Sequence, residues 1–162
     1  MIFPIVILAA VTLQRLGELA LASRNTRRLL DQGGREAGAG HYPLIVALHA
    51  AWLIGLWLLA WDRPVDLIWL AIYLVLQLGR VWVIASLGGR WTTRIIILPQ
   101  APLVRRGPYR FVKHPNYGVV AAEIAVLPLV FHLYAYAAVF FLLNAGVLAI
   151  RVRAENAALR AV

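Results

Sequence analysis

The chain has 162 residues, of which 62% are hydrophobic, with a formal net charge of +9 and a mean hydropathy of +0.77. Soluble domains are about 45–50% apolar, so this composition argues against a water-soluble domain and indicates a membrane protein. The chain contains no cysteine, which excludes disulfides, thiolate zinc sites and iron–sulfur clusters.

Five apolar runs predict the helices of the fold, and in chain order they are residues 2–22, 42–60, 67–87, 117–130 and 134–150. A helix needs roughly 20 mostly apolar residues to cross a bilayer core of about 30 Å. The second and third runs meet this length, and the fifth is slightly short. The fourth is shorter and ends near Pro128, so the last two runs are predicted to form a tight helical hairpin.

The predicted fold class is therefore all-α, a polytopic membrane protein with about five transmembrane helices. The chain is too short for a separate soluble domain, so residues 1–162 are predicted to form one integral-membrane domain. The first connector, DQGGREAGAG (31–40), is glycine-rich and is predicted to be flexible. The third connector, about residues 86–116, contains several prolines and cannot be one continuous helix. We expect it to be a structured cytoplasmic loop.

The cations of the connectors predict the orientation in the membrane. The first connector, the third connector and the carboxyl-terminal tail are basic, whereas the second connector carries only Arg63. This alternation predicts an amino terminus outside and a carboxyl terminus in the cytoplasm. Anionic lipid head groups suffice as partners for these cations, so no nucleic-acid binding is expected. The four histidines lack H-E-x-x-H spacing, and no metal site is predicted.

Ionisable residues inside the predicted helices are costly in a bilayer and normally face the interior of the bundle. Arg15 and Glu18 are three residues apart and share a helix face, and Gln77 and Arg80 repeat this spacing. Glu123 has no local partner, so a residue of another helix is expected to offset its cost, and Arg15 and Arg80 are the candidates. The favoured interpretation is polar pairing that holds helices together. The alternative is an ion-conduction path in a small transporter or channel.

Asn144, Arg151 and Glu155 fall on one stripe of the last helix at about 100° per residue. One interpretation is an i,i+4 ion pair between Arg151 and Glu155, worth about 0.3 kcal/mol at a helix end. The other is the polar wall of a pocket at the cytoplasmic interface. The spacing alone leaves both open.

The stretch RRGPYRFVKHPNYG, residues 105–118, is strongly basic and broken by prolines. A basic juxtamembrane loop needs only cations and aromatic anchors. It does not need Gly107 for a tight turn, or His114 and Tyr117 three residues apart at a helix start. A rigid loop that leads into a helix amino terminus suits a polar, partly anionic small molecule. A non-catalytic membrane scaffold would leave this arrangement unexplained.

These residues resemble the isoprenylcysteine carboxyl methyltransferase family. The family pattern is G-x-Y, then [RK]-H-P-x-Y, then R-x-x-x-E-E-x-x-L, and the matching segments here are GPYRFVKHPNYG and RVRAENAAL (151–159), preceded by APLV (101–104). The resemblance covers roughly residues 90–160. The longer stretch GRWTTRIIILPQAPLVRRGPYRF is also similar to the small bacterial branch that methylates long-chain alkylpyrones and related polyketide lipids.

The resemblance implies an integral-membrane enzyme that uses S-adenosylmethionine without a Rossmann fold. It implies a substrate-side, catalytic arginine at Arg151. It also implies cofactor contacts within about residues 90–160, namely Ala101, Pro102, Leu103, Val104, Tyr109, His114, Pro115, Asn116, Tyr117 and Glu155. The sequence departs from the family pattern at Asn156, which replaces the second acid. It also ends at Val162, without the tyrosine-bearing tail of the eukaryotic enzymes, which makes a prenylated-protein substrate less secure.

The implied reaction is O-methylation of a lipidic acceptor, either an isoprenylcysteine-type carboxylate or an alkylpyrone-type hydroxyl. We expect it at the cytoplasmic face of a bacterial plasma membrane, with membrane lipids as further partners. Both acceptors are ionised near neutral pH, so catalysis would rest on positioning and exclusion of water rather than on a strong base. N-methylation of a phospholipid amine is the alternative among enzymes, and it requires a base.

Overall fold

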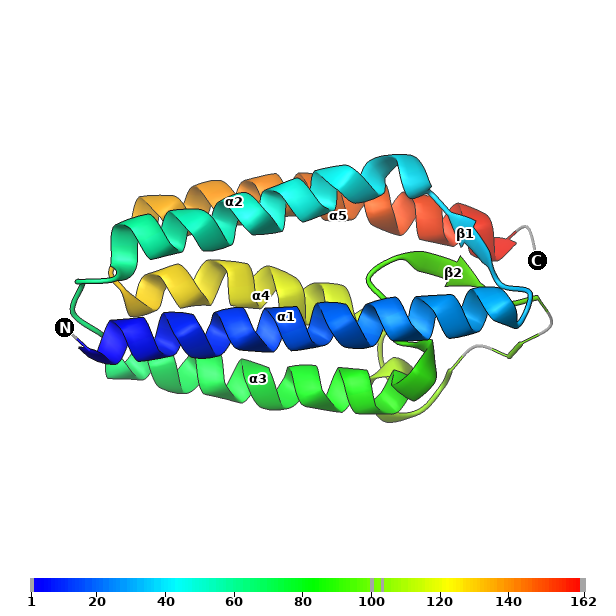
Figure 1. Cartoon of the computed structure of the whole chain (residues 1–162), viewed down its shortest axis with the longest axis horizontal. Helices are drawn as coiled ribbons and strands as arrows, with labels where there is room; N and C mark the ends of the chain where they lie inside the picture. Colours follow the sequence, from blue (N-terminus) through cyan, green and yellow to red (C-terminus); the bar gives the residue numbers. More distant parts are fainter. Residues whose placement is uncertain (1, 100, 103, 161–162) are drawn as a thin grey trace.

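The computed structural model describes residues 2–99, 101–102 and 104–160. The α-helices of the described chain lie side by side along the long axis of the molecule (Figure 1). They are α1 (Ile2–Asp31), α2 (Tyr42–Ala60), α3 (Leu67–Leu87), α4 (Pro115–Val130) and α5 (Tyr134–Arg160). All five helices predicted from the apolar runs are present in the described part of the chain.

Four of these helices are long and apolar enough to cross a membrane, namely α1, α2 with its preceding turn, α3 and α5. The fourth predicted span, α4, has 16 residues, which is about 24 Å at 1.5 Å per residue. It is therefore shorter than a bilayer core. The apolar helices indicate an integral membrane protein.

The connections between the helices follow from local sequence. Asp66 caps α3, because its Oδ1 accepts hydrogen bonds from the backbone N–H groups of Ile68 and Trp69 at 2.9 and 3.2 Å. The chain reverses between α4 and α5 in three residues, where the N–H groups of Phe131 and Leu133 both bind the carbonyl of Pro128. His132 has a positive φ of 58° in this turn. The result is the tight hairpin expected for the last two helices.

A two-stranded antiparallel sheet joins the first and third connectors. Strand β1 (Arg35–Ala37) pairs with β2 (Ile95–Ile97), with Arg35 opposite Ile97. The sheet is an addition to the predicted all-α fold, and the connector predicted to be flexible contains a paired strand and a 3-10 turn, η1 (Ala39–His41). Strands of three residues carry little periodicity of their own, and these two are far apart in the sequence.

The described part of the third connector is structured, as predicted, and packs on the carboxyl-terminal end of α3. It contains the 3-10 turns η2 (Gly88–Arg90) and η3 (Gly107–Arg110). Gly107 has a φ of +57°, and a Cβ there would collide with the side chain of Ser86. Arg106 Nε donates a hydrogen bond to the carbonyl of Ser86 at 2.7 Å. A glycine is therefore required where η3 touches α3.

Four charged residues form a buried network between α1, α3 and α4, which we call the ion cluster: Arg15, Glu18, Arg80 and Glu123. The Glu123 side chain is 0% exposed and accepts from Arg15 Nη2 and Arg80 Nη1, each at 2.9 Å. Arg80 also binds both carboxylate oxygens of Glu18 at 2.6 Å. Both arginines that the sequence offered as partners, Arg15 and Arg80, therefore bind Glu123.

Two amides extend the ion cluster. Gln77 Nε2 donates to Glu123 Oε1 at 2.9 Å, and Gln14 Nε2 donates to Gln77 Oε1 at 2.6 Å. The cluster contains two arginines and two glutamates, so its formal charges cancel. These contacts connect three helices and agree with the interpretation of polar pairing rather than a conduction path.

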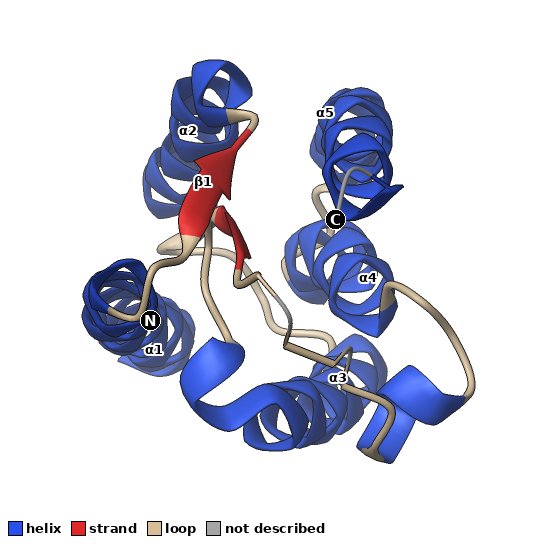
Figure 2. Cartoon of the chain, turned by 90° about the vertical axis from the view of Figure 1, so that its right-hand side faces the viewer, coloured by secondary structure: helices blue, strands red, loops and turns tan. Residues whose placement is uncertain are grey.

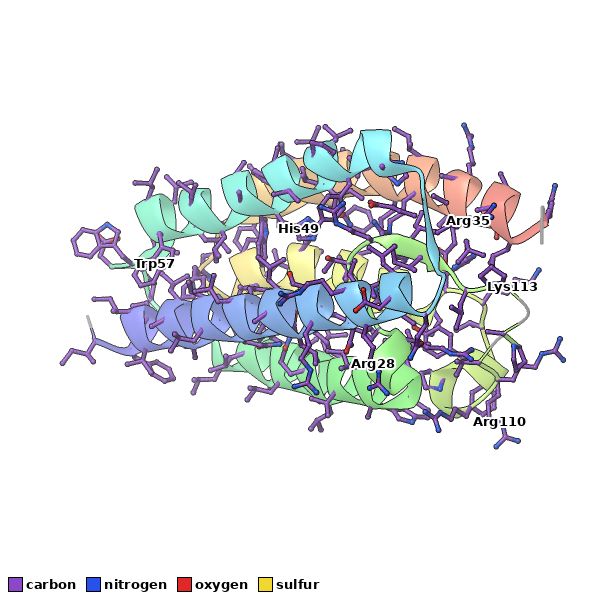
Figure 3. The ribbon with its side chains drawn as sticks, turned by 45° about the vertical axis from the view of Figure 1, so that its right-hand side comes forward. Arg28, Arg35, His49, Trp57, Arg110 and Lys113 are labelled. Carbon is purple, nitrogen blue, oxygen red and sulfur yellow. The ribbon has the colours of Figure 1, made fainter. Side chains whose placement is uncertain are left out.

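The two ends of the bundle differ in character. Figure 3 shows Arg35, Arg110 and Lys113 at the end that holds the sheet and the third connector, and Trp57 towards the opposite end. We call the first of these the loop end. The carboxyl-terminal turns of α1, α3 and α5 and the start of α4 also lie there (Figure 1).

Candidate functional site

A cavity of about 1420 Å³ lies at the loop end. It is enclosed by the third connector, the first turn of α4 and the last turns of α5, with Leu29 of α1 at one side. Small-molecule pockets in proteins are about 300–1,000 Å³, so this cavity has room for a large ligand and part of a second one.

The cavity brings together most of the residues predicted as site residues. Those that line it are Ala101, Pro102, Val104, Tyr109, His114, Asn116, Tyr117, Arg151 and Glu155. Pro115 is buried as the first residue of α4 and is not among the residues that line the cavity. Leu103 lies outside the described residues.

Arg151, Tyr117 and Glu155 form a chain of hydrogen bonds in the wall of the cavity. Arg151 Nε donates to the Tyr117 hydroxyl at 2.9 Å, and this hydroxyl donates to Glu155 Oε2. Arg151 Nη2 also donates to the carbonyl of Thr93 at 2.7 Å. Among the described residues no ion pair joins Arg151 directly to Glu155. Of the two interpretations of this stripe, the polar wall of a pocket agrees with the cavity, and a link through the Tyr117 hydroxyl takes the place of the i,i+4 ion pair.

The guanidinium of Arg151 is buried, but not all of its N–H donors form hydrogen bonds with described residues. Arginine has five N–H donors, and the two hydrogen bonds to Tyr117 and Thr93 use only Nε and Nη2. No hydrogen bond from Nη1 is found within the part of the chain that the structure describes. Arg151 is thus held in a fixed position while it retains donors for a ligand in the cavity.

His114 connects the third connector to the end of α5. Its ring stacks on Tyr117 at 5.4 Å between centroids and 18° between planes. Nδ1 lies 3.5 Å from Glu155 Oε2, and Nε2 lies 3.3 Å from Asn156 Oδ1. Asn156, which replaces the second acid of the family pattern, thus offers a neutral acceptor to His114 in place of a carboxylate.

Tyr109 is held neutral in the same cavity. Burial raises the pKa of its hydroxyl well above the ordinary value, and the negative charge of Glu155 raises it further. The phenol therefore stays protonated over the physiological range and can donate a hydrogen bond.

Positive charge dominates the lining of the cavity. Among the described lining residues Glu155 is the one carboxylate, against the cations Arg90, Arg94, Arg105, Arg110, Lys113, Arg151 and Arg160. Arg94 is neutralised by Glu36 at 2.9 Å. The remaining cations favour a ligand that places an anionic group beside them.

The sequence pattern of the Isoprenylcysteine carboxyl methyltransferase (ICMT) family matches residues 69–161, which include most of α3, the third connector and both helices of the hairpin. The chain belongs to the isoprenylcysteine carboxyl methyltransferase family. Membership of this family, together with the apolar helices, indicates a membrane methyltransferase. The resemblance found in the sequence motifs is thereby confirmed at the level of the family.

Two relatives of this ICMT-family chain match it over nearly its whole length. Uncharacterized protein YpbQ of Bacillus subtilis (strain 168) is 37% identical over 159 residues, which are 95% of each chain. An uncharacterized protein of Haemophilus influenzae (strain ATCC 51907 / DSM 11121 / KW20 / Rd) is 26% identical over 165 residues, 98% of this chain and 96% of the other. No solved structure matches the chain.

Two buried polar atoms test whether the cavity fits S-adenosylmethionine, the cofactor that ICMT-family membership implies. Asn116 Oδ1, an acceptor, and Trp91 Nε1, a donor, are buried without a hydrogen-bond partner among the described residues, and both residues line the cavity. Unpaired buried polar groups are rare in native proteins, so a ligand with donors and acceptors is a natural partner. S-adenosylmethionine carries both kinds of group, and the residues present fit it.

The motifs did not indicate three parts of this ICMT-family site: Trp91, the backbone carbonyl of Thr93 and the strand β2. Trp91 is 2% exposed, and Ile95, Ile96 and Ile97 supply an apolar part of the cavity lining. The stretch that contains them was part of the resemblance, but nothing in its residue types assigned them to the cavity. The one available signal was an indole in a polar connector, which needs a hydrogen-bond partner when buried.

Proposed function

We propose that this protein transfers a methyl group from S-adenosylmethionine to an anionic oxygen of a lipidic acceptor at the cytoplasmic face of a bacterial plasma membrane. The observation that carries this proposal is the single cavity shared by the third connector and the end of α5. In it, Arg151, Tyr117, Glu155 and His114 are connected by hydrogen bonds and short contacts.

The residues on the connector side would hold the cofactor. Asn116 Oδ1 and Trp91 Nε1 would bind its polar groups, and Tyr109 would donate a hydrogen bond. Glu155 provides the one negative charge among the described lining residues and suits the cationic end of the cofactor. When bound, S-adenosylmethionine supplies an electrophilic methyl group whose C–S bond breaks as the new O–C bond forms.

Arg151 would hold the acceptor. Its remaining N–H donors can bind an anionic oxygen, and its bonds to Tyr117 and Thr93 keep the guanidinium in place. An oxygen that is already ionised needs no general base, so fixed geometry and exclusion of water carry the reaction. The apolar wall of β2 and Leu159 suits the part of a lipid next to its polar group.

The charge of the cavity supports an anionic acceptor rather than an amine. An ammonium group would enter a space with several cations and one carboxylate, and it would have to lose a proton before attack. A carboxylate or an acidic enol meets neither obstacle. These are the acceptor groups of the isoprenylcysteine and alkylpyrone types.

The test is methyl transfer from methyl-tritiated S-adenosylmethionine to lipids extracted from a bacterial membrane, with the purified protein in detergent. We expect radioactivity in the organic phase on a non-basic lipid. Release as methanol in mild alkali would identify a carboxylate ester, and an alkali-stable product would identify a methylated enol. Label on an amine, or no labelled lipid from any extract, would contradict the proposal.

A further inference from the structure

We propose that residues 110–113 form a docking segment for anionic phospholipid head groups of the surrounding membrane, and that docking fixes the walls of the cavity. The docking segment consists of Arg110, Phe111, Val112 and Lys113. Its binding to lipid is independent of the chemistry in the cavity, whereas its effect on turnover rests on the proposed function.

The docking segment exposes apolar side chains between cations. Phe111 is 73% exposed and Val112 is 55% exposed, and both flanking cations are exposed as well. The Arg110 guanidinium lies 5.4 Å from the centre of the Phe111 ring. Among the described residues, neither Arg110 nor Lys113 forms a salt bridge. A combination of apolar tips and cations without carboxylate partners is typical of segments that bind anionic membrane surfaces.

The backbone holds these side chains outward. The N–H groups of Phe111 and Val112 both bind the carbonyl of Pro108, at 3.1 and 3.2 Å. Pro108 and Pro115, which lie on either side of the segment, are buried. The exposure of Phe111 therefore follows from the backbone of this turn.

The docking segment lies at the side of the helix bundle. Viewed along the bundle from the loop end, η3 and the link from it to α4 lie outside the ring of helices (Figure 2). The neighbouring residue on α3 is Trp82, which is 52% exposed and whose Nε1 would lie 3.2 Å from a Cβ at Gly107. Tryptophans on membrane helices are enriched at the level of the head groups, which favours this level for Trp82. The docking segment follows Gly107 closely and so lies beside the edge of the bilayer.

The chemistry of the segment favours anionic over zwitterionic lipid. Two cations attract head groups that carry net negative charge, and each adds roughly fivefold to association with such a surface. Zwitterionic head groups offer phosphates but no net charge. Phe111 and Val112 add apolar contact with the boundary between head groups and acyl chains. An anionic phospholipid is thus the partner that uses both parts of the segment.

The same segment connects two residues of the cavity. Tyr109 precedes it directly and His114 follows it directly, and both line the cavity, as do Arg110 and Lys113 at its rim. A segment of four residues cannot move without moving its neighbours. Docking on the membrane would therefore fix Tyr109 and His114 in the positions that bind the cofactor.

A fluorescent label can report docking directly, because the chain has no cysteine and a single introduced one is unique. Val112→Cys would carry an environment-sensitive dye, with Ala157→Cys on an exposed position of α5 as the matched control. The labelled proteins would be placed in nanodiscs of phosphatidylcholine, with or without phosphatidylglycerol. Emission and methyl transfer would be measured in low and high salt, and Phe111→Ser would be added to the first variant.

We expect phosphatidylglycerol to shift the emission at position 112 to the blue, with reversal in high salt and little change at position 157. Phe111→Ser should weaken the shift. Methyl transfer by the unlabelled protein should rise severalfold with phosphatidylglycerol, and less so in the Phe111→Ser variant.

Three results would overturn parts of the proposal and are distinguishable. Equal emission in both lipids would exclude docking, whatever the methyl transfer. A blue shift that requires added soluble protein would assign the segment to a protein partner instead. A lipid-dependent shift with equal methyl transfer in both lipids would exclude the coupling, whereas absence of methyl transfer in both would count against the proposed function and leave the docking result intact.

Discussion

Arg151→Ala is expected to reduce the rate of methyl transfer by about 10²-fold, the loss that follows when a reacting group is no longer held in the right position. The structure gives the reason. Arg151 is buried, its guanidinium is fixed by Tyr117 and Thr93, and it retains donors that face no described partner. The affinity for S-adenosylmethionine should change little, because the connector side of the cavity would hold the cofactor. Turnover with lipid and equilibrium titration of the cofactor measure the two quantities separately.

Arg153→Ala is the matched control for this prediction, since Arg153 lies on the same helix and is exposed. It should transfer methyl groups at nearly the normal rate. Tyr109→Ala and His114→Ala should show the reverse pattern, with weakened binding of the cofactor. An Arg151→Ala protein that turns over normally would contradict the assignment of Arg151 to the acceptor. Loss of cofactor affinity equal to the loss of turnover would place Arg151 on the cofactor side instead.

Glu123→Ala is expected to lower the free energy of unfolding by about 3–5 kcal/mol, the cost of leaving a buried charge without its partner. Glu123 accepts from Arg15 and Arg80 and is fully buried. Without it, two arginines share the single carboxylate of Glu18. Unfolding of the purified protein in mixed micelles, followed by circular dichroism, measures the change. Asp62→Ala, in the exposed turn between α2 and α3, is the control and should have little effect.

A double variant separates charge imbalance from lost packing. Arg15→Leu combined with Glu123→Leu removes one cation and one anion and leaves the pair of Arg80 and Glu18, whose two hydrogen bonds are 2.6 Å long. This variant should recover much of the stability lost in Glu123→Ala, because a buried pair can be replaced by apolar residues at little cost. If the double variant loses as much free energy of unfolding as Glu123→Ala, charge imbalance is not the cause of the loss in Glu123→Ala.

The helices could be predicted from the sequence because hydropathy reports where lipid surrounds the chain. The same measure underestimates their length where they leave the membrane. α1 continues to Asp31, nine residues past the apolar run, and α5 continues to Arg160, ten residues past its own. These extensions are polar, and they enclose the cavity at the loop end. The sheet formed by Arg35–Ala37 and Ile95–Ile97 was not predictable, because its pairing depends on where α1 and α3 end in space.

The sequence was sufficient to predict which residues form most of the site, but not which hydrogen bonds join them. The motifs indicated Tyr117, Arg151 and Glu155, but helical spacing left open whether the last two form a direct pair or the wall of a pocket. The observed link depends on how α4 packs against α5, which places the Tyr117 hydroxyl between them. The partners of Glu123 likewise depend on how the helices are rotated about their axes. The sequence offered Arg15 and Arg80 as alternatives, and both bind Glu123. Trp91 was missed because its role depends on burial alone.

The most direct test of the central claim, that the third connector and the end of α5 form one cavity for the methyl donor, is photocrosslinking with radiolabelled S-adenosylmethionine. The purified protein would be irradiated, digested and analysed by mass spectrometry, with excess S-adenosylhomocysteine as competitor. We expect competed adducts on peptides from residues 90–117 and 151–160. Competed adducts confined to other segments, or no competed adducts at cofactor concentrations that saturate methyl transfer, would contradict the claim.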